Sequence, residues 1–407
     1  MHLCLNLIVK NESKNMLRCL ESFNKIKYRN ERGELEEAVK AIAITDTGST
    51  DDTIQIVEEW IKKNKKLGGI QSKPWSGPAF HFAINRNLSL EYAYEVIEEN
   101  KKGSEVWYIL FTDADNLIHA SVQGEEIIIP NDLNQDRYFC DFRTGNSHFS
   151  GNLMVKYQPE KGWCWIGGVH EYLTHKDANI SSGKVTSLWM DARCEGFRSQ
   201  NDLKYVRDVK YLRELIAEAK KYKERKVKGV YEEEEASTLV RYHFYLAQSL
   251  RDSGFGMEKQ SEEAYLKRAE MGDWAQEVYV SYVEAFKQRL TRKGKMDMKG
   301  ASYLEKAFNT DPERLEAPHY YVKYLNSEKR FNQAWHFAKG LLKCEKKDGK
   351  LFMESHIYDH AFLDEAGVSA FYAGNKVMAK LLFEKVLPKV HENQKERLLT
   401  NIKHCSS

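Results

Sequence analysis

Hydrophobic and polar positions in the first half of the chain alternate between short apolar runs and segments with helical spacing. The runs 3–9, 38–44 and 105–111 have the length of buried strands. Residues spaced three or four apart between these runs predict three amphipathic helices, with the inward-facing sets Met16, Leu20, Phe23 and Ile26; Ile54, Val57 and Ile61; and Leu90, Ala93, Tyr94 and Ile97. The alternation predicts an α/β domain with a largely parallel sheet.

Helical spacing disappears between residues 127 and 195. Short apolar runs in this part, YFCDF (138–142) and NLMVKY (152–157), have the character of strands. We expect them to be antiparallel strands that complete the sheet and cover one rim of a site.

Continuous helical periodicity begins near residue 200 and extends to the end of the chain. Alanines recur there at a spacing near the roughly 34-residue unit of tetratricopeptide repeats, at Ala264, Ala301, Ala334 and Ala379. We therefore expect an α/β domain over 1–197, a helical connection over 198–235 and a tetratricopeptide-like array of helical hairpins over 236–407. The charged run 220–235 is typical of a solvated helix face.

The composition excludes several classes of partner. The 407 residues carry a formal net charge of +2, from 62 Lys and Arg against 60 Asp and Glu, so no overall basic field attracts nucleic acid or an anionic membrane. Seven cysteines show neither metal-ligand spacing nor a disulfide framework. Without a charged leader or an apolar stretch of about 18 residues, we expect a cytoplasmic protein with no membrane span. The sequons at Asn11, Asn87 and Asn179 are then chance matches.

Three polar clusters directly follow apolar strands, at 10–12, 46–53 and 113–116. Because ligands bind outside the carboxyl ends of strands in an open parallel sheet, we expect the three clusters to converge there. Asp113 and Asp115 lie two residues apart, so both side chains can face one ligand. Two close carboxylates with hard oxygen ligands suit Mg²⁺ or Mn²⁺. The alternative interpretation is a polar turn after a strand.

Two further segments have residues suited to a nucleotide. Gly48 follows Asp46 and permits a close turn, and Ser49 leads into a helix N-terminus. Arg86 and Asn87 precede a predicted helix, and arginine offers a rigid fork for phosphate oxygens. Either feature alone is more often a capped helix or a surface arginine.

The segment GWCWIGGVHEYL (162–173) combines two tryptophans with a His–Glu pair after two glycines. The indoles of Trp163 and Trp165 suit either sugar stacking at a site rim or core packing. In an extended segment His170 and Glu171 point in different directions, so they cannot easily perform the same task.

The order KNE, DTGSTDDT, FAxxRN, DAD and W-x-G-G-V-HEYL resembles the family 2 glycosyltransferases with the Rossmann-like A-type nucleotide-sugar fold, in the subgroup with tetratricopeptide-like helices after that domain. The resemblance covers nearly the whole chain. It implies a transferase of the EC 2.4 class that moves a hexosyl or N-acetylhexosaminyl group from a nucleoside diphosphate sugar, UDP-linked, to a hydroxyl of a glycan or protein acceptor, with inversion.

Roles for individual residues follow from the same resemblance. It places Asp46 and Glu12 in the nucleotide pocket, Asp113 toward the ribose and the metal, and Asp115 on the metal. The remaining nucleotide-binding residues that it implies are Asn11, Gly48, Ser49, Arg86 and Asn87. The cation, Mn²⁺ or Mg²⁺, would neutralise the charge that develops on the departing diphosphate.

The acceptor side carries open assignments. Glu171 is the expected base and His170 the expected partner of the metal or diphosphate, although these two roles could be exchanged. Asp141 and Asp191 are alternative bases. His81 stands where the family often has an acidic residue, so that residue's role cannot be transferred to this chain.

Other classes of function are also considered. A sugar nucleotidyltransferase would use a similar metal pair, but it normally shows a Gly-rich loop with Arg and Lys after the first strand, where this chain has KNESKNM. A catalytically inactive repeat-containing adaptor would have no reason to keep the acidic residues at the strand ends. The helical part is expected either to form a homodimer or to present the acceptor.

Overall fold

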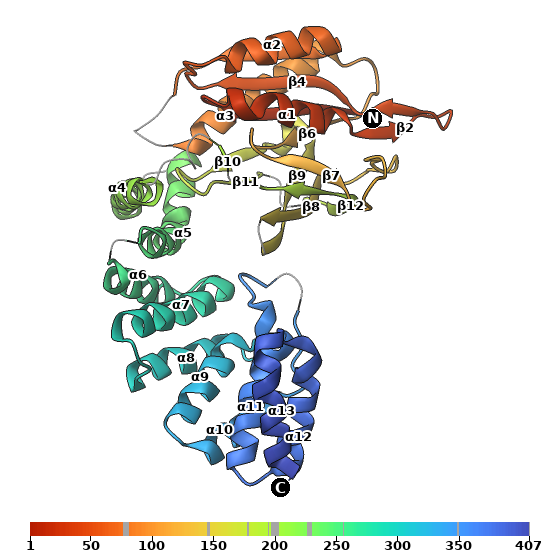
Figure 1. Cartoon of the computed structure of the whole chain (residues 1–407). Helices are drawn as coiled ribbons and strands as arrows, with labels where there is room; N and C mark the ends of the chain where they lie inside the picture. Colours follow the sequence, from red (N-terminus) through yellow and green to blue (C-terminus); the bar gives the residue numbers. More distant parts are fainter. Residues whose placement is uncertain are drawn as a thin grey trace. The chain divides into compact units, whose positions relative to one another are not determined.

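The computed structural model describes residues 1–75, 81–144, 147–176, 179–193, 195–196, 203–225, 230–254, 256–347 and 350–406 (Figure 1). The chain divides into two compact units, Met1–Thr238 and Leu239–Ser407. The expected connection over 198–235 lies partly outside the described residues. Cys194 lies wholly outside them. Every helix within the described ranges is too short or too polar to cross a membrane.

Unit 1 is built on a mixed sheet of eight strands in the order β5-β4-β1-β6-β9-β8-β12-β7. Its strands are β1 His2–Val9, β4 Val39–Asp46, β5 Leu67–Ser72, β6 Trp107–Phe111, β7 Leu117–Ala120, β8 Arg137–Thr144, β9 Ser147–Lys156 and β12 Ser182–Asp191. Neighbours from β5 to β6 are parallel, as are β8 and β12, whereas β9 and β7 run antiparallel to their neighbours. The predicted α/β fold with a mostly parallel sheet is confirmed.

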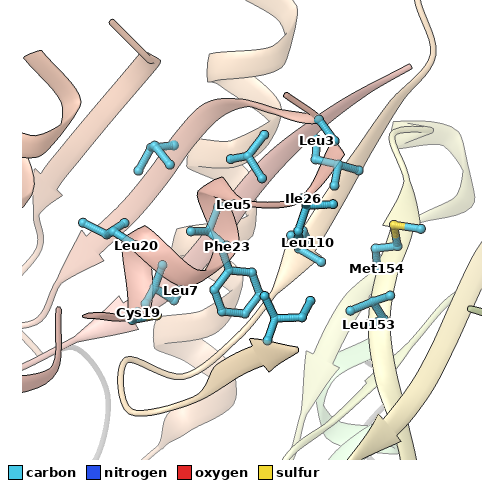
Figure 2. Close-up of a cluster of buried hydrophobic side chains, with 14 of the residues drawn as sticks. Leu3, Leu5, Leu7, Cys19, Leu20, Phe23, Ile26, Leu110, Leu153 and Met154 are labelled. Atoms are coloured by element: carbon cyan, nitrogen blue, oxygen red, sulfur yellow. The ribbon is translucent and has the colours of Figure 1, made fainter. Parts of the chain in front are cut away.

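Helices cover both faces of this sheet. Period-two alternation directs Leu5, Leu7 and Leu110 toward α1 (Ser13–Asn24) and α2 (Thr53–Asn64), where they meet Phe23 (Figure 2). The alternate positions of the same strands, such as Ile109, pack against α3 (Phe82–Asn100) on the other face. Because each strand is buried on both sides, its sequence is a continuous apolar run.

The observed helices and strands follow the predicted ones closely. In α2, Val57 is buried as expected, but Trp60 is more deeply buried than Ile54 or Ile61. Ile26 is buried two residues beyond the end of α1. The expected antiparallel strands are β8 and β9, and two small sheets add β2 Lys27–Arg29 with β3 Leu35–Glu37, and β10 Cys164–Ile166 with β11 Tyr172–Thr174.

The C-terminal part is helical, as expected. Helix α4 (Lys204–Arg225) belongs to unit 1, and α5 (Val230–Asp252) begins in it. Unit 2 continues with α6 Glu258–Glu270, α7 Ala275–Lys293, α8 Met298–Thr310, α9 Glu316–Ser327, α10 Phe331–Ala338, α11 Phe362–Tyr372, α12 Lys376–Val386 and α13 Glu392–Ser406. Consecutive helices from α6 to α13 pack on one another or on the short turns between them (Figure 1). Ala334 and Ala379 are fully buried in this array.

A charged cap at the start of α8 predicts a pH-dependent stability. Asp297 accepts a hydrogen bond from the Gly300 amide at 2.8 Å and one from Arg289 Nε at 2.7 Å. The Arg289 hydrogen bond outweighs burial and lowers the pKa of Asp297 to about 2. Because this pKa lies below the unfolded value of about 3.9, the stabilisation is present above pH 4 and is lost as the pH falls toward 2.

Asp297→Asn keeps the capping oxygen but removes the charge. We expect it to lower the melting temperature at pH 6 and to have little effect at pH 2, which thermal unfolding at both pH values measures. Glu305→Gln, an exposed residue of the same helix, is the matched control. An equal loss at both pH values would contradict the explanation.

Candidate active site

The polar segments after β1, β4 and β6 meet at one edge of the sheet. Val9 pairs with Asp46 and Asn6 with Phe111, so the three strands end side by side. The Asn11 amide donates to Ser49 Oγ at 2.9 Å, and the Thr50 amide donates to Asn11 Oδ1 at 2.7 Å. Asn11 has a φ of 55°, a conformation that asparagine tolerates better than most residues. The structure therefore brings the first two predicted clusters into direct contact.

Asp46 shapes the loop that follows it. Its carboxylate is 1% exposed and accepts hydrogen bonds from the Gly48 amide at 3.0 Å and the Ser49 amide at 3.1 Å. Gly48 has a φ of 104°, which a side chain would strain. The buried charge is thus satisfied by the loop's own backbone, and the loop is held in one conformation at the strand edge.

Arg86 lies near the start of α3. It donates hydrogen bonds to two carboxylates from distant parts of the chain. Its Nε donates to Glu171 Oε1 at 2.6 Å, and its Nη2 donates to Asp113 Oδ1 at 2.7 Å. Burial alone would lower the pKa of the Arg86 guanidinium, but Asp113 and Glu171 outweigh it and raise the pKa. The Arg86 and Glu171 side chains are 14% and 13% exposed, whereas that of Asp113 is 54% exposed. Asp113 is therefore the member of this cluster most open to a ligand.

Asp115 lies beside the predicted nucleotide residue Glu12. The Gly196 amide donates to Asp115 Oδ2 at 2.8 Å. A Cβ added at Gly196 would lie 3.1 Å from Glu12 Oε1 and 3.3 Å from Asp115 Oδ2, so the two carboxylates border the same residue. Glu12 Oε2 in turn accepts from Asn15 Nδ2 at 2.8 Å.

Arg18 and Glu195 complete this region, and neither was expected from the sequence. Arg18 Nη2 donates to Glu195 Oε2 at 2.6 Å, and Asn15 Nδ2 donates to the Glu195 carbonyl at 3.3 Å. These contacts fix the described residues Glu195 and Gly196 against α1 and next to Asp115. No local pattern could have revealed them, because the partners are separated by most of unit 1.

The two tryptophans have different environments. Trp163 is 4% exposed and packs in the core beside Leu173, which matches the core interpretation that the sequence left open. Trp165 is half-buried: the Phe111 ring meets it edge-on at 5.3 Å, and the Arg86 guanidinium lies 5.0 Å from its ring centroid. Trp165 therefore supports Arg86.

Asn87 fixes β10 to α3. The Trp165 amide donates to Asn87 Oδ1 at 2.7 Å, and Asn87 Nδ2 donates to the Trp165 carbonyl at 2.9 Å. Both polar atoms of the Asn87 amide are therefore engaged by backbone, and the side chain positions the strand that carries Trp165.

His170 and Glu171 follow the Gly–Gly turn, and their side chains have different environments. Gly167 has a φ of 100° and His170 a φ of 56°, and the Phe82 amide donates to the Gly168 carbonyl at 2.7 Å. Glu171 consequently points inward to Arg86, while His170 is exposed. His81, at the position that departs from the family pattern, caps α3 by accepting from the Ile84 amide at 3.3 Å.

The two alternative bases lie on the C-terminal half of the sheet. Asp141 in β8 forms an ion pair with Lys184 at 2.6 Å. Asp191 ends β12 and lies 3.9 Å from His119 Nε2 and 3.8 Å from Arg193 Nε. Asp191 pairs with Leu117, so it reaches the same edge as the Asp113–Asp115 segment.

The described residues contain no group of three His, Cys, Asp or Glu side chains arranged around a metal position. Mg²⁺ in phosphate-transferring sites is commonly bound by one or two carboxylates together with substrate phosphates. The exposed Asp113 and the adjacent Asp115 fit that donor set, with hard oxygens at a strand edge. They fit a cation shared with a diphosphate better than one enclosed by protein alone.

A cavity of about 630 Å³ lies away from these carboxylates, along β7 and the loop after it. His119, Arg143 and Trp189 line part of it. The imidazole of His119 is stacked on Trp189 at 4.6 Å, and the Arg143 guanidinium lies 4.2 Å from the same indole. Because β7 starts directly after Asn116, the strand that lines this cavity follows the Asp113–Asp115 segment in the chain.

Comparisons with known proteins agree with this geometry for unit 1. Residues 5–141 match the family model described as Glycosyl transferase family 2, a range that contains most of β1, all of β4 and β6, and the polar ends of the three strands. The match supports a glycosyltransferase of the EC 2.4 class. A comparison with curated proteins gave no match.

One similar solved structure is the crystal structure of BtubC (BKLC) from P. vanneervenii. It shares 14% sequence identity, and the alignment covers 49% of this chain and 82% of that chain with a TM-score of 0.33. A likeness at this level carries no argument about the fold or activity of this chain.

Proposed function

We propose that this chain is a metal-dependent inverting glycosyltransferase that takes a sugar from a nucleoside diphosphate sugar, UDP-linked, and transfers it to a hydroxyl of a glycan or protein. The observation on which the proposal rests is the convergence of the Asp46 loop, Glu12 and the Asp113–Asp115 segment at one strand edge inside the range that matches the family model.

Each residue has a proposed task on the donor side. Glu12 and the loop shaped by Asp46, with Asn11, Gly48 and Ser49, bind the nucleoside, and Asp113 contacts its ribose. Asp115 holds the cation, with Asp113 beside it and His170 on the exposed side. When bound, the cation supplies positive charge to the departing diphosphate. Arg86 lies beside Asp113 and adds a fixed positive charge in the same place.

On the acceptor side we propose Glu171 as the base. Its Oε1 accepts the hydrogen bond from Arg86, which fixes the orientation of the carboxylate. The second oxygen, Oε2, is then directed to receive the proton of the acceptor hydroxyl. The Trp165 ring packs against the Arg86 guanidinium and helps to hold it in this position.

The decisive test is hydrolysis of a panel of UDP- and GDP-linked sugars with and without Mn²⁺. We expect slow hydrolysis of one donor class that depends on Mn²⁺. Asp115→Asn should lower that rate by about 10²-fold, because a carboxylate that holds the cation stabilises the leaving group.

The exposed loop variant Asp132→Asn serves as the matched control and should retain the wild-type rate. If no donor is hydrolysed and no nucleotide raises the melting temperature, the transferase proposal fails and the adaptor alternative is favoured.

A further inference from the structure

Three side chains on the last strands of the sheet line the cavity of about 630 Å³ and have no task on the donor side. Trp189 of β12 pairs with His119 of β7, and Arg143 lies on the neighbouring strand β8. The imidazole stacks on the indole at 4.6 Å, and the guanidinium lies 4.2 Å from the same indole. We call His119, Trp189 and Arg143 the cavity row.

The cavity row faces the same side of the sheet as the proposed base. The residues next to its members in the three strands, Ile118, Met190 and Phe142, pack in or against the core that contains α1. Side chains alternate between the two faces of a strand, so the row lies on the opposite face. That face is the one covered by α3, where Glu171 reaches Arg86.

Two nitrogen atoms of the cavity row have no hydrogen-bond partner among the described residues. Arg143 Nε and His119 Nε2 are both shielded from solvent and unpaired. Asp191 Oδ2 lies 3.9 Å from His119 Nε2, which is too far for a hydrogen bond. Because shielded polar atoms are unfavourable without a partner, the oxygens of a bound molecule would stabilise this arrangement.

The indole of Trp189 does not offer a free face to a sugar ring. Since β12 lies between β8 and β7, the Arg143 guanidinium and the His119 imidazole reach the indole from opposite sides. The row therefore presents charge and hydrogen-bonding nitrogens in place of an apolar surface. A guanidinium can bind a carboxylate through two parallel hydrogen bonds, so the row suits an anionic oxygen group.

Charges around the cavity favour a group with a single negative charge. Lys25, Lys27 and Arg143 line the cavity together with Glu125 and Glu126. Glu126 is paired with Lys27. One positive charge is in excess, which matches a carboxylate better than a phosphate monoester, whose charge at neutral pH is nearer −2.

The carboxylates of neighbouring strand positions are bound to other cations. Asp141 pairs with Lys184 at 2.6 Å, and Asp191 Oδ2 lies 3.8 Å from Arg193 Nε. The Arg143 guanidinium contacts the Trp189 ring instead. Its charge is thus available to a molecule in the cavity.

The cavity row is near the strand edge at which the donor is proposed to bind. Leu117 is the first residue of β7 and pairs with Asp191. His119 is two residues further along β7, and two residues of an extended strand span about 7 Å. One acceptor molecule can therefore place a hydroxyl near the Asp113–Asp115 segment and another of its groups in the cavity.

We propose that this cavity binds a carboxylate on a sugar unit of the acceptor, so that the acceptor is an acidic glycan of the uronic acid type. Arg143 binds the carboxylate, and His119 forms a hydrogen bond with an oxygen of the same sugar unit. The role of the bound molecule as an acceptor rests on the proposed function, whereas its binding is measured without a donor.

The test compares cellobiouronic acid, a disaccharide with one carboxylate, with its neutral counterpart cellobiose. Calorimetric titration of the full-length protein should show that cellobiouronic acid binds at least about 10-fold more tightly, since hydrogen bonds to charged groups are the stronger ones. Arg143→Ala should abolish this preference. Arg137→Ala, the matched control, removes a guanidinium that lies over Phe139 in the same strand and should keep the preference.

Two results would overturn the proposal directly. One is equal binding of the two disaccharides by the wild type, and the other is an unchanged preference in folded Arg143→Ala. A glucose phosphate monoester and inorganic phosphate serve as charge controls and should both bind more weakly than cellobiouronic acid. Tighter binding of either one would contradict the assignment of a carboxylate site.

Donor hydrolysis with Mn²⁺, measured on the same preparation, separates this inference from the proposed function. Hydrolysis without a preference for cellobiouronic acid would overturn the inference and leave the transferase proposal intact. A preference for cellobiouronic acid without hydrolysis of any donor would leave the carboxylate site but overturn its role for an acceptor.

A second measurement covers the case in which Arg143→Ala does not fold. The indole N–H signal of Trp189 in the NMR spectrum of the nitrogen-labelled wild type is assigned by its absence from Trp189→Phe. It should shift saturably with cellobiouronic acid and much less with cellobiose. An unchanged signal at saturating cellobiouronic acid, or equal shifts with both disaccharides, would mean that the carboxylate does not bind at the cavity row.

Discussion

Arg86→Ala is expected to lower the rate of Mn²⁺-dependent donor hydrolysis by about 10³-fold, since a fixed charge near the leaving group and the alignment of two carboxylates are both lost. Glu171, whose side chain is 13% exposed, and Asp113 would both lose their ion pair with Arg86. The measurement is the hydrolysis rate of the donor that the wild type uses best, at saturating Mn²⁺.

Companion variants identify the cause of that loss. Arg86→Lys keeps a charge but lacks the fork that reaches Asp113 and Glu171 together, so we expect an intermediate rate. Arg137→Ala removes an arginine that stacks on Phe139 at the start of β8, and it should leave the rate unchanged. If Arg86→Ala hydrolyses the donor at the wild-type rate, the cluster of Arg86, Asp113 and Glu171 has only a structural role.

The role of Glu171 can be separated from that of Arg86. Glu171→Gln keeps the shape of the side chain but cannot accept a proton. If Glu171 is the base, this variant should lower transfer to an acceptor more than hydrolysis of the donor by water, whereas a residue that only positions Arg86 should affect both rates equally.

Arg268→Ala is expected to destabilise unit 2 by about 3–5 kcal/mol, the cost of removing one partner from a buried ion pair. Arg268 is fully buried, and its Nε donates to Glu277 Oε2 at 2.9 Å while its Nη1 donates to the Gly272 carbonyl at 2.7 Å. Burial raises the pKa of Glu277 even with Arg268 present. Hydrogen exchange of the α6 and α7 amides in urea measures the local free energy of unfolding.

The double variant Arg268→Met with Glu277→Leu tests the explanation. Replacing both charges by apolar side chains of similar volume should restore most of the lost stability, because no uncompensated charge is left in the core. A double variant as unstable as Arg268→Ala would indicate that packing, and not the charge, causes the loss.

Local pattern alone determined much of this protein. The runs 3–9, 38–44 and 105–111 became β1, β4 and β6, because strand and helix periods depend only on backbone geometry. The parallel arrangement then required the polar residues after Val9, Asp46 and Phe111 to meet at one edge, as they do. The helical nature of the second half followed from the same periodicity.

Only the tertiary structure decided which partner each polar side chain has. Arg86 finds Glu171, 85 positions away, and Asp115 finds the Gly196 amide, 81 positions away. The same holds for Trp163, whose burial in the core and not at a site rim depends on what α3 and β11 place around it. Such pairings depend on how segments that are distant in the sequence pack together in the folded chain. Neither the local spacing of residues nor the composition determines that packing.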